Sequence, residues 1–435
     1  MTITELYKLF IQQEQKITTD TRKLDKGSIF FALKGDNFDA NTFAQQAIDA
    51  GCSYAIVDNK EVANEVTIFY VDDVLNTLQQ LAKYHRQQLT IPVIGITGSN
   101  GKTTNKELIQ AVLSKKYNTY ATKGNLNNHI GVPLTLLAIT KQHQMAIVEM
   151  GANHQGEIAL LSELSNPNYG LITNIGKAHL EGFGGVEGIK KGKSELYKHI
   201  KQNNGKLFIN ADDEVLLELS GHIEKITYGT KPECDIHGEL IPTSEYVEFI
   251  WNTKHHALKN IPVTKTQLFG HYNFINTLCA TCIGNYFGVS NNDINEALAN
   301  YLPEMNRSQV KHTETNTLIL DAYNANPSSM QLAVQHFAKQ HFPSKLAILG
   351  DMLELGSYTD EEHLAILELL KNQHIENALL VGELFYKHKH KFADFFFFKT
   401  TEETIEYLKK KAIKKHHVLI KGSRGIKLEK LVVFL

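Results

Sequence analysis

The segment GSNGKTT, residues 98–104, combines the residue types that bind phosphate. Glycines allow backbone amides to approach an anion closely, and Lys102 adds a positive charge for phosphate oxygens. Thr103 or Thr104 can offer a hydroxyl to magnesium. We therefore expect a bound phosphate group to lie against the whole loop, which consists of Gly98, Ser99, Asn100, Gly101, Lys102, Thr103 and Thr104.

The residues around this loop place it between a strand and a helix. The run VIGIT, residues 93–97, is short and rich in β-branched residues, and the segment after the loop carries an apolar stripe at helical spacing. The match to the strict phosphate-loop pattern is incomplete, because Ile96 stands where that pattern has glycine. An ordinary glycine-rich turn is the alternative, but the strand, the GKTT sequence and the helix together favour phosphate binding.

Several other apolar runs also end in a polar residue that could contact a ligand. In open parallel sheets, ligands bind outside the carboxyl ends of the strands. Short apolar runs alternate with longer amphipathic segments along the chain, which is typical of strand–helix units. The sequence therefore predicts the α/β class with ligand contacts at strand ends. The residues at these ends are Thr97, Glu149, Asn174, Asp321, Asp351 and Lys421.

The length of 435 residues corresponds to roughly three domains at about 150 residues each. We place them at residues 1–86, 87–302 and 303–435. Within the second, the helical rhythm weakens between about residues 227 and 270, where short strands predict a small, more antiparallel accessory sheet.

The composition excludes several classes of protein. A net charge of -2 provides no general attraction to nucleic acid or membrane surfaces. The sequence has no signal peptide and no apolar run of about 18 residues, so we expect a cytoplasmic protein that spans no membrane. The four cysteines do not make a disulfide framework. Cys279 and Cys282 form one CxxC motif in an apolar helical segment, which favours core packing over metal or redox chemistry.

Longer motifs give a resemblance to a known family. The segments TGSNGKTT, KGNLNNHIGVPLTLL, VEMGANHQGEI and TNIGKAHLEGFG occur in this order and together resemble the Mur ligases, ATP-dependent amide-forming enzymes of peptidoglycan precursor synthesis. The later segments GHYNFIN, DAYNANPSSM, GDMLELG and IKGSRG are similar to the members that join D-alanyl-D-alanine to UDP-N-acetylmuramoyl-tripeptide. The resemblance covers nearly the whole chain. It implies an N-terminal UDP-sugar-binding domain, a central P-loop-type parallel-sheet ATPase domain and a C-terminal Rossmann-like domain.

The resemblance also implies a reaction. ATP phosphorylates the tripeptide carboxylate, the dipeptide amine attacks the acyl phosphate, and phosphate leaves. Such phosphoryl transfer depends mainly on positioning and charge neutralisation. Substrates bound between domains imply hinge closure. We expect ATP, Mg²⁺ and the two peptide substrates as the only ligands, and a monomer as the working form.

The resemblance also implies two Mg²⁺ ions at the ATP site. Glu149, His179 and Thr103 match family positions near the metals, and the lysine matching Lys193 is typically carbamylated, which makes it an oxygen ligand. The expected catalytic set is Lys102, Lys193, His179 and Glu149. From the residues alone, Glu149 could equally be a surface carboxylate. Lys193 lies in a lysine-rich segment that could be a solvated helical face.

Contacts to the rest of ATP are expected from both later domains. Asparagine offers a donor and an acceptor that suit an adenine edge, although helix capping would use the same residue type. The matching family arginine contacts ATP phosphates, and the matching aspartate contacts the ribose. The expected residues are Asn273, Asn276, Arg307, Asp321, Tyr323 and Asn326.

The two peptide substrates are assigned by position. For the UDP-sugar peptide we expect Asp20, Thr21, Arg22, Asn125 and Asn128. For the acceptor dipeptide, whose carboxylate needs a cationic or amide-rich pocket, we expect Lys421, Ser423 and Arg424. For Asp20, Thr21 and Arg22, a loop salt bridge and cap is the alternative role. One departure from the family is Asp39-Ala40-Asn41, where relatives often have Asp-Gly-His.

Three other functions stay open from the sequence. A ligase that adds the third peptide residue usually carries a DNPR motif when it is specific for diaminopimelate, and this chain has none. Folylpolyglutamate synthase shares the phosphate loop but should lack the first domain. A non-catalytic nucleotide-binding module would not need Lys102, Glu149, His179 and Lys193 together.

Overall fold

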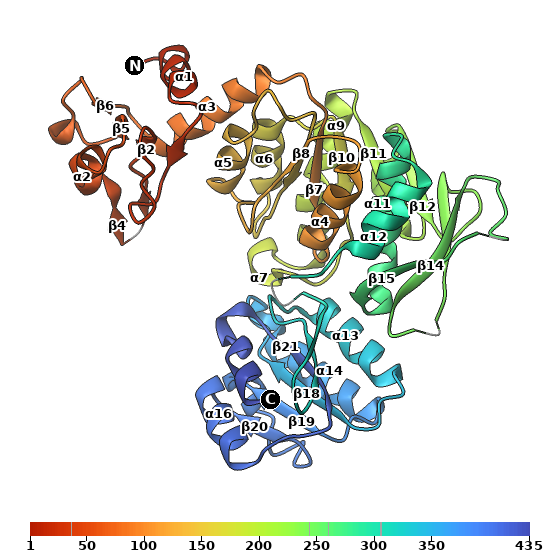
Figure 1. Cartoon of the computed structure of the whole chain (residues 1–435). Helices are drawn as coiled ribbons and strands as arrows, with labels where there is room; N and C mark the ends of the chain where they lie inside the picture. Colours follow the sequence, from red (N-terminus) through yellow and green to blue (C-terminus); the bar gives the residue numbers. More distant parts are fainter. Residues whose placement is uncertain (36, 243, 260, 305–306) are drawn as a thin grey trace.

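The computed structural model describes residues 1–35, 37–242, 244–259, 261–304 and 307–435. Its strands form three main sheets, which we call the N-terminal, central and C-terminal units (Figure 1). Mostly parallel strands alternate with helices in each, so the predicted α/β class with three units is confirmed. Within these ranges, no helix combines the length and the apolar character needed to cross a bilayer.

The N-terminal unit is a parallel sheet of four strands in the order β1-β2-β5-β6. Its strands are β1 (Ile17–Thr18), β2 (Ile29–Phe31), β5 (Tyr54–Val57) and β6 (Ile68–Tyr70), and β3 (Lys34–Gly35) pairs separately with β4 (Phe38–Asp39). Its helices are α1 (Ile3–Gln12), α2 (Ala44–Asp49), α3 (Val74–Gln87) and the 3-10 turns η1 (Ala40–Phe43) and η2 (Lys60–Val62). The apolar runs at residues 27–33, 52–58 and 66–73 form the strands β2, β5 and β6.

Helix α3 joins this unit to the next one. It begins at the capping residue Asp73, whose side chain accepts a hydrogen bond from the Asn76 N–H. It packs on α1 and β2 and also on α5 and α6 of the central unit. Near its end, the Arg86 guanidinium donates to the backbone carbonyls of Ser165 (2.9 Å) and Asn166 (3.0 Å). The expected boundary at residue 86 falls in the last turn of this helix.

The central unit is one sheet of nine strands in the order β15-β14-β13-β12-β11-β10-β7-β9-β8. Its strands are β7 (Val93–Thr97), β8 (Thr119–Ala121), β9 (Met145–Glu149), β10 (Tyr169–Ile172), β11 (Lys206–Asn210), β12 (Lys225–Gly229), β13 (Ile236–Leu240), β14 (Tyr246–Thr253) and β15 (Thr264–Phe269). Helices α4, α11 and α12 cover one face, and α5, α6 and α9 cover the other. Successive strand residues point to opposite faces, so Ile94 and Ile96 pack under α4 while Val93 packs on the other side.

The helices of the central unit lie between and after these strands. They are α4 (Lys102–Leu113), α5 (Gly131–Leu137), α6 (Glu157–Ser165), α7 (Leu180–Phe183), α8 (Val186–Lys193), α9 (Glu195–Gln202), α10 (Glu214–Ser220), η3 (His271–Asn273), α11 (Phe274–Tyr286) and α12 (Asn291–Asn300). Cys279 and Cys282 are buried in α11, where burial raises the pKa of both thiols. Core packing is therefore the role of this CxxC motif.

The expected small antiparallel accessory sheet is present as part of the main sheet. Strands β13, β14 and β15 are antiparallel as predicted, but β12 pairs in parallel with both β11 and β13. The four strands therefore extend the main sheet and do not form a sheet of their own. An uncovered edge at β11 would leave backbone groups unpaired, and this pairing satisfies them.

The C-terminal unit has six strands in the order β16-β17-β21-β18-β19-β20, all parallel except β16. Its strands are β16 (Gln309–His312), β17 (Thr317–Leu320), β18 (Lys345–Gly350), β19 (Ala378–Val381), β20 (Phe396–Phe398) and β21 (His417–Lys421). Its helices are α13 (Pro327–Lys339), η4 (Gly356–Tyr358), α14 (Thr359–Asn372), α15 (Glu383–Tyr386), α16 (Thr401–Lys410), η5 (Arg424–Ile426) and η6 (Leu428–Phe434). Helices on both faces of a mostly parallel sheet confirm the Rossmann-like expectation.

Candidate functional site

The phosphate loop connects β7 to α4, as the sequence predicts, and two glycines give it its shape. Gly98 has φ +142°, and a Cβ there would lie 2.0 Å from Thr173 Oγ1. Gly101 has φ +77° and directly precedes α4. The loop is held from β10, because the Asn100 N–H donates to Asn174 Oδ1 (3.1 Å) and Thr173 Oγ1 donates to the Asn100 carbonyl (2.6 Å).

Lys102 turns back over this loop. Its Nζ donates to the carbonyls of Gly98 (2.7 Å) and Ser99 (3.1 Å). Burial lowers the pKa of Lys102 to about 8, and the nearby Glu149 charge acts in the opposite direction. The Lys102 ammonium is therefore held at the phosphate loop, where a bound phosphate could contact it. In this structure it is bonded to the carbonyls of Gly98 and Ser99.

Glu149 at the end of β9 has the surroundings of a magnesium ligand. Its Oε1 accepts hydrogen bonds from Thr103 Oγ1 (3.2 Å) and Asn127 Nδ2 (2.8 Å). Its Oε2 is buried and has no hydrogen-bond partner. Magnesium takes oxygen ligands and is usually completed by water and substrate phosphates, so a single carboxylate beside a hydroxyl fits it. Across the described ranges, no cluster of three or more His, Cys, Asp or Glu side chains could hold a metal alone.

A cavity of about 600 Å³ opens between the central and C-terminal units, beside the phosphate loop. The expected residues that line it are Ser99, Asn100, Gly101, Lys102, Thr103, Thr104, Asn125, Asn128, Glu149, His179, Asn273, Asn276, Arg307, Asp321, Tyr323, Asn326 and Lys421. The cavity thus brings together residues more than 300 positions apart in the chain.

Sequence reasoning missed several lining residues. They include Asn127, Tyr272 and Ser308. Asn127 lies between the two expected asparagines of GNLNNH, and it is the one whose amide contacts Glu149. Asn128 instead uses its side-chain oxygen to accept from the N–H of Gly131 (2.8 Å) at the start of α5. The motif was visible in the sequence, but the choice among its three asparagines depends on the loop conformation.

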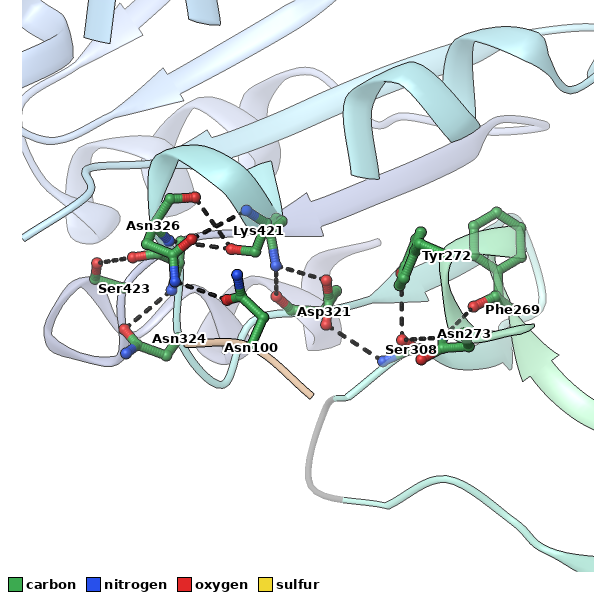
Figure 2. A network of polar contacts seen from close by, with 12 residues as sticks. Asn100, Phe269, Tyr272, Asn273, Ser308, Asp321, Asn324, Asn326, Lys421 and Ser423 are labelled. Carbon is green, nitrogen blue, oxygen red and sulfur yellow. Dashed lines mark hydrogen bonds and ion pairs between the residues drawn. The ribbon is translucent and has the colours of Figure 1, made fainter. Parts of the chain in front are cut away.

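A chain of polar contacts continues from η3, directly before α11, into the C-terminal unit (Figure 2). Asn276 Nδ2 donates to Asn273 Oδ1 (2.9 Å), and Asn273 Nδ2 donates to Ser308 Oγ (3.0 Å). Tyr272 OH shares a hydrogen bond with Ser308 Oγ (3.2 Å). Asn273 occupies the N-cap position of α11, but its side chain makes no capping hydrogen bond. The capping alternative for Asn273 is therefore wrong.

The C-terminal unit contributes charged and amide groups to the same cavity. Asp321 follows β17, and its Oδ2 accepts from Lys421 Nζ at 2.5 Å (Figure 2). Arg307 stacks on the ring of Tyr323. Asn326, the capping residue of α13, donates from Nδ2 to Asn100 Oδ1 of the phosphate loop (2.7 Å). This last bond connects the two units directly at the loop.

A second cavity of about 240 Å³ adjoins the first. Ser423 and Arg424, two of the three residues expected to contact the acceptor, line it, whereas Lys421 lines the larger cavity. The two cavities share His179, Tyr323, Asn324 and Asn326. A group bound in the second cavity would therefore lie next to a group bound in the first.

Lys193 is buried, with 1% of its surface exposed. Its Nζ donates to the Ala152 carbonyl (3.2 Å) and lies 4.9 Å from the centre of the Phe183 ring. Burial lowers the pKa of Lys193 well below its ordinary value, which favours the neutral amine. The alternative of a solvated helical face is wrong for Lys193, although Lys191 and Lys198 are exposed.

The residues Asp20, Thr21 and Arg22 line neither cavity. Arg22 donates from Nε and Nη2 to the two Asp20 carboxylate oxygens, both at 2.9 Å. This contact lowers the pKa of Asp20 to about 2. In this structure the segment forms the local salt bridge that was the alternative role.

Comparisons with known proteins agree with this site. Residues 96–284 match the Mur ligase middle domain, and residues 306–424 match the Mur ligase glutamate ligase domain. The UDP-N-acetylmuramoyl-tripeptide–D-alanyl-D-alanine ligase of Bacillus subtilis is 36% identical over 96% of this chain and 92% of its own length.

Two solved structures share the whole fold. A crystal structure of MurF from Acinetobacter baumannii is 33% identical, with a TM-score of 0.85 over 96% of this chain and 92% of that one. The MurF ligase of Thermotoga maritima in complex with ADP is 26% identical, with a TM-score of 0.84 over 97% of both chains. On this evidence, the chain belongs to the Mur ligase family.

Proposed function

We propose that this protein joins D-alanyl-D-alanine to UDP-N-acetylmuramoyl-tripeptide, with conversion of ATP to ADP and phosphate. The main observation behind this proposal is that two cavities adjoin one another and share His179. One lies at the phosphate loop and the other at Ser423 and Arg424. Relatives with this printed activity cover nearly the whole chain, which supports the same choice of substrates. We also propose that the reaction takes place in the cytoplasm.

The chemistry follows from the groups around the larger cavity. A carboxylate does not condense with an amine spontaneously in water, so it first accepts the terminal phosphoryl group of ATP. In our proposal Lys102 exchanges its two carbonyl contacts for phosphate oxygens, and Arg307 adds positive charge from the C-terminal unit. Thr103 and Glu149 would hold magnesium, which neutralises phosphate charge when it is bound. The dipeptide amine then attacks the acyl phosphate, and phosphate leaves.

We further propose that Lys193 reacts with CO₂ to form a carbamate, with loss of one proton from the amine. The neutral, buried amine supports this step. The carbamate and His179 would serve a second magnesium ion. Protein equilibrated with ¹³C-bicarbonate should give a carbamate carbon signal in NMR that a Lys193→Gln variant lacks. Absence of that signal from the parent protein would contradict the modification.

The remaining contacts are proposed by position. Asp321 would contact the ribose, and Asn273 and Asn276 the adenine, since all three line the larger cavity. Asn326 and Tyr323 would complete the nucleotide site. For the UDP-sugar peptide we propose Asp20, Thr21, Arg22, Asn125 and Asn128, and for the dipeptide carboxylate Lys421, Ser423 and Arg424. We also propose that the protein works as a monomer.

Phosphate release tests this function directly. The assay should offer UDP-N-acetylmuramoyl-dipeptide and tripeptides ending in diaminopimelate or lysine, each with several amino acceptors. We expect turnover only when a tripeptide and D-alanyl-D-alanine are both present. Turnover with the dipeptide and a single amino acid would identify a ligase for the third residue, and glutamate transfer to a folate would indicate folylpolyglutamate synthase. A protein that binds ATP without any turnover would be a binding module.

A further inference from the structure

Two loops from different units meet beside the shared wall of the cavities. His179 lies in the loop after β10 of the central unit, and Glu354 lies in the loop after β18 of the C-terminal unit. The His179 Nδ1 is in hydrogen-bond contact with Glu354 Oε2. The backbone adds a second contact, because the Glu181 N–H donates to the Glu354 carbonyl (3.3 Å). His179 and Glu354 are thus joined across the interface between units.

Both partners have an uncommon backbone conformation. His179 has φ 55° and Glu354 has φ 63°, in the left-handed region that residues with a Cβ rarely adopt. Such conformations persist where the surroundings hold them in place, and they occur often at functional sites. Here two such residues point their side chains at one another from opposite sides of an interface.

The loop that carries Glu354 is fixed from within its own unit. The Met352 N–H donates to the Nε2 of the fully buried His363 (3.1 Å), and the Leu353 N–H donates to Ser423 Oγ (3.0 Å). These bonds fix the two residues directly before Glu354. The position of its carboxylate is therefore set by the C-terminal unit and not by the central unit.

We infer that Glu354 is a positioning residue for His179. An ionised carboxylate only accepts hydrogen bonds, so the contact places the proton of neutral His179 on Nδ1 and leaves Nε2 with its lone pair. His179 lines both cavities, and its Nε2 is then the nitrogen able to bind a ligand there. Because the carboxylate comes from the other unit, the correct imidazole state forms only when the two units are in contact. This inference rests on the proposed ligase function.

The test uses the full chain with ¹⁵N-labelled histidine, with the His179 signals assigned by their loss in a His179→Asn variant. In the parent protein, His179 should be the Nδ1–H tautomer. In Glu354→Ala it should move toward the Nε2–H tautomer, and Glu354→Gln, which keeps an acceptor oxygen, should remain closer to the parent. The matched control is Glu362→Gln, which removes another ion pair across the same interface, Lys177 Nζ to Glu362 Oε1 at 2.5 Å.

Steady-state kinetics of the same variants provide a second test. Glu354→Ala should lower kcat of ligation by about tenfold or more, with KM for ATP changed less than about twofold, and Glu354→Gln should recover part of the loss. Glu362→Gln should leave both constants near the parent values. An unchanged His179 tautomer in Glu354→Ala, or an equal kcat loss in Glu362→Gln, would overturn the inference. A parent protein without ligation would instead contradict the proposed function, since the tautomer measurement needs no turnover.

Discussion

The guanidinium carbon of Arg307 lies 3.5 Å from the centre of the Tyr323 ring, so the two planar groups are in cation–π contact. Both residues line the larger cavity, and the Arg307 Nε is buried without a hydrogen-bond partner. Arginine stacks readily on aromatic faces because its charge is delocalised and weakly hydrated. The ring therefore holds a positive charge at the wall of the phosphate cavity.

Replacing this ring should weaken the use of ATP. A cation–π contact contributes about 1 kcal/mol, so Tyr323→Leu should lower kcat/KM for ATP by roughly fivefold, whereas Tyr323→Phe should stay close to the parent. Steady-state kinetics with varied ATP measure the effect. Tyr386→Leu is the matched control, because Lys389 Nζ lies 4.3 Å from the centre of that ring and neither residue lines either of the two cavities. Equal losses in the Leu and Phe variants of Tyr323 would show that the stack has no such role.

Lys102 should be needed for the chemical step. Loss of its charge beside the transferred phosphoryl group should lower kcat by a factor on the order of 10³ in Lys102→Ala. Single-turnover phosphate release measures this, with circular dichroism as the check on folding. Lys115→Ala, which removes a cation paired with Glu296 just after α4, is the control and should keep parental rates. A folded Lys102→Ala protein with the parent's rate would contradict the phosphate-loop assignment.

Glu149→Gln should raise the magnesium concentration that supports half-maximal activity by about tenfold. The variant keeps the size of the side chain and an oxygen that can accept from Thr103 and Asn127, so the fold should be retained. A magnesium titration of the initial rate gives the result. Glu163→Gln, which replaces an exposed carboxylate paired with Lys83, should leave the titration unchanged. A Glu149→Gln variant with the parent's magnesium dependence would contradict the metal site.

His363 predicts how stability depends on pH. Burial lowers its pKa from 6.5 to about 4, and its Nδ1 donates to the Thr359 carbonyl (2.6 Å) while its Nε2 accepts from the Met352 N–H. Below pH 6.5 the unfolded chain binds a proton at this residue that the folded chain does not bind. Its contribution to stability is therefore present above pH 6.5, decreases as the pH falls, and is lost at about pH 4.

This loss should amount to about 3 kcal/mol of unfolding free energy between those two pH values. Urea unfolding at several pH values measures it. His363→Gln cannot take up the proton, so its stability should fall less over the same range, while other buried histidines such as His336 affect both proteins equally. Parallel pH profiles for the parent and the variant would contradict this role of His363.

The sequence was most informative where the structure depends on near neighbours. The loop from Gly98 to Thr104, the parallel strands on either side of it and the strand-end residues Glu149 and Asp321 could all be predicted, because a strand, a turn and a helix have local patterns. The pairing of β12 with β11, which joins β13, β14 and β15 to the main sheet, could not be predicted, since the partner of a strand edge is chosen by residues far away in the chain.

Residues that act through others were also missed. Asn127 and Glu354 lie in motifs that the sequence shows, but their roles, like that of His363, appear only when Glu149, His179 and the loop before Glu354 are seen beside them. Similarly, the departure at Asn41 has a structural use, because its Nδ2 donates to Asp39 (2.7 Å) and Asp58 (2.8 Å) and ties one end of β5 to η1. Side-chain partners of this kind depend on the tertiary structure.

Ser308 lies directly before β16, where the chain enters the C-terminal unit. Its hydroxyl contacts Tyr272 and Asn273 of the central unit, while its N–H donates to Asp321 Oδ1 (3.4 Å) on the other side (Figure 2). A rotation of the C-terminal unit against the central unit must strain or break these hydrogen bonds of Ser308. Asn273 is one of these bonded residues, so a nucleotide that takes the Asn273 amide as its partner would weaken the Asn273–Ser308 contact. Nucleotide binding would then change how easily the C-terminal unit rotates against the central unit.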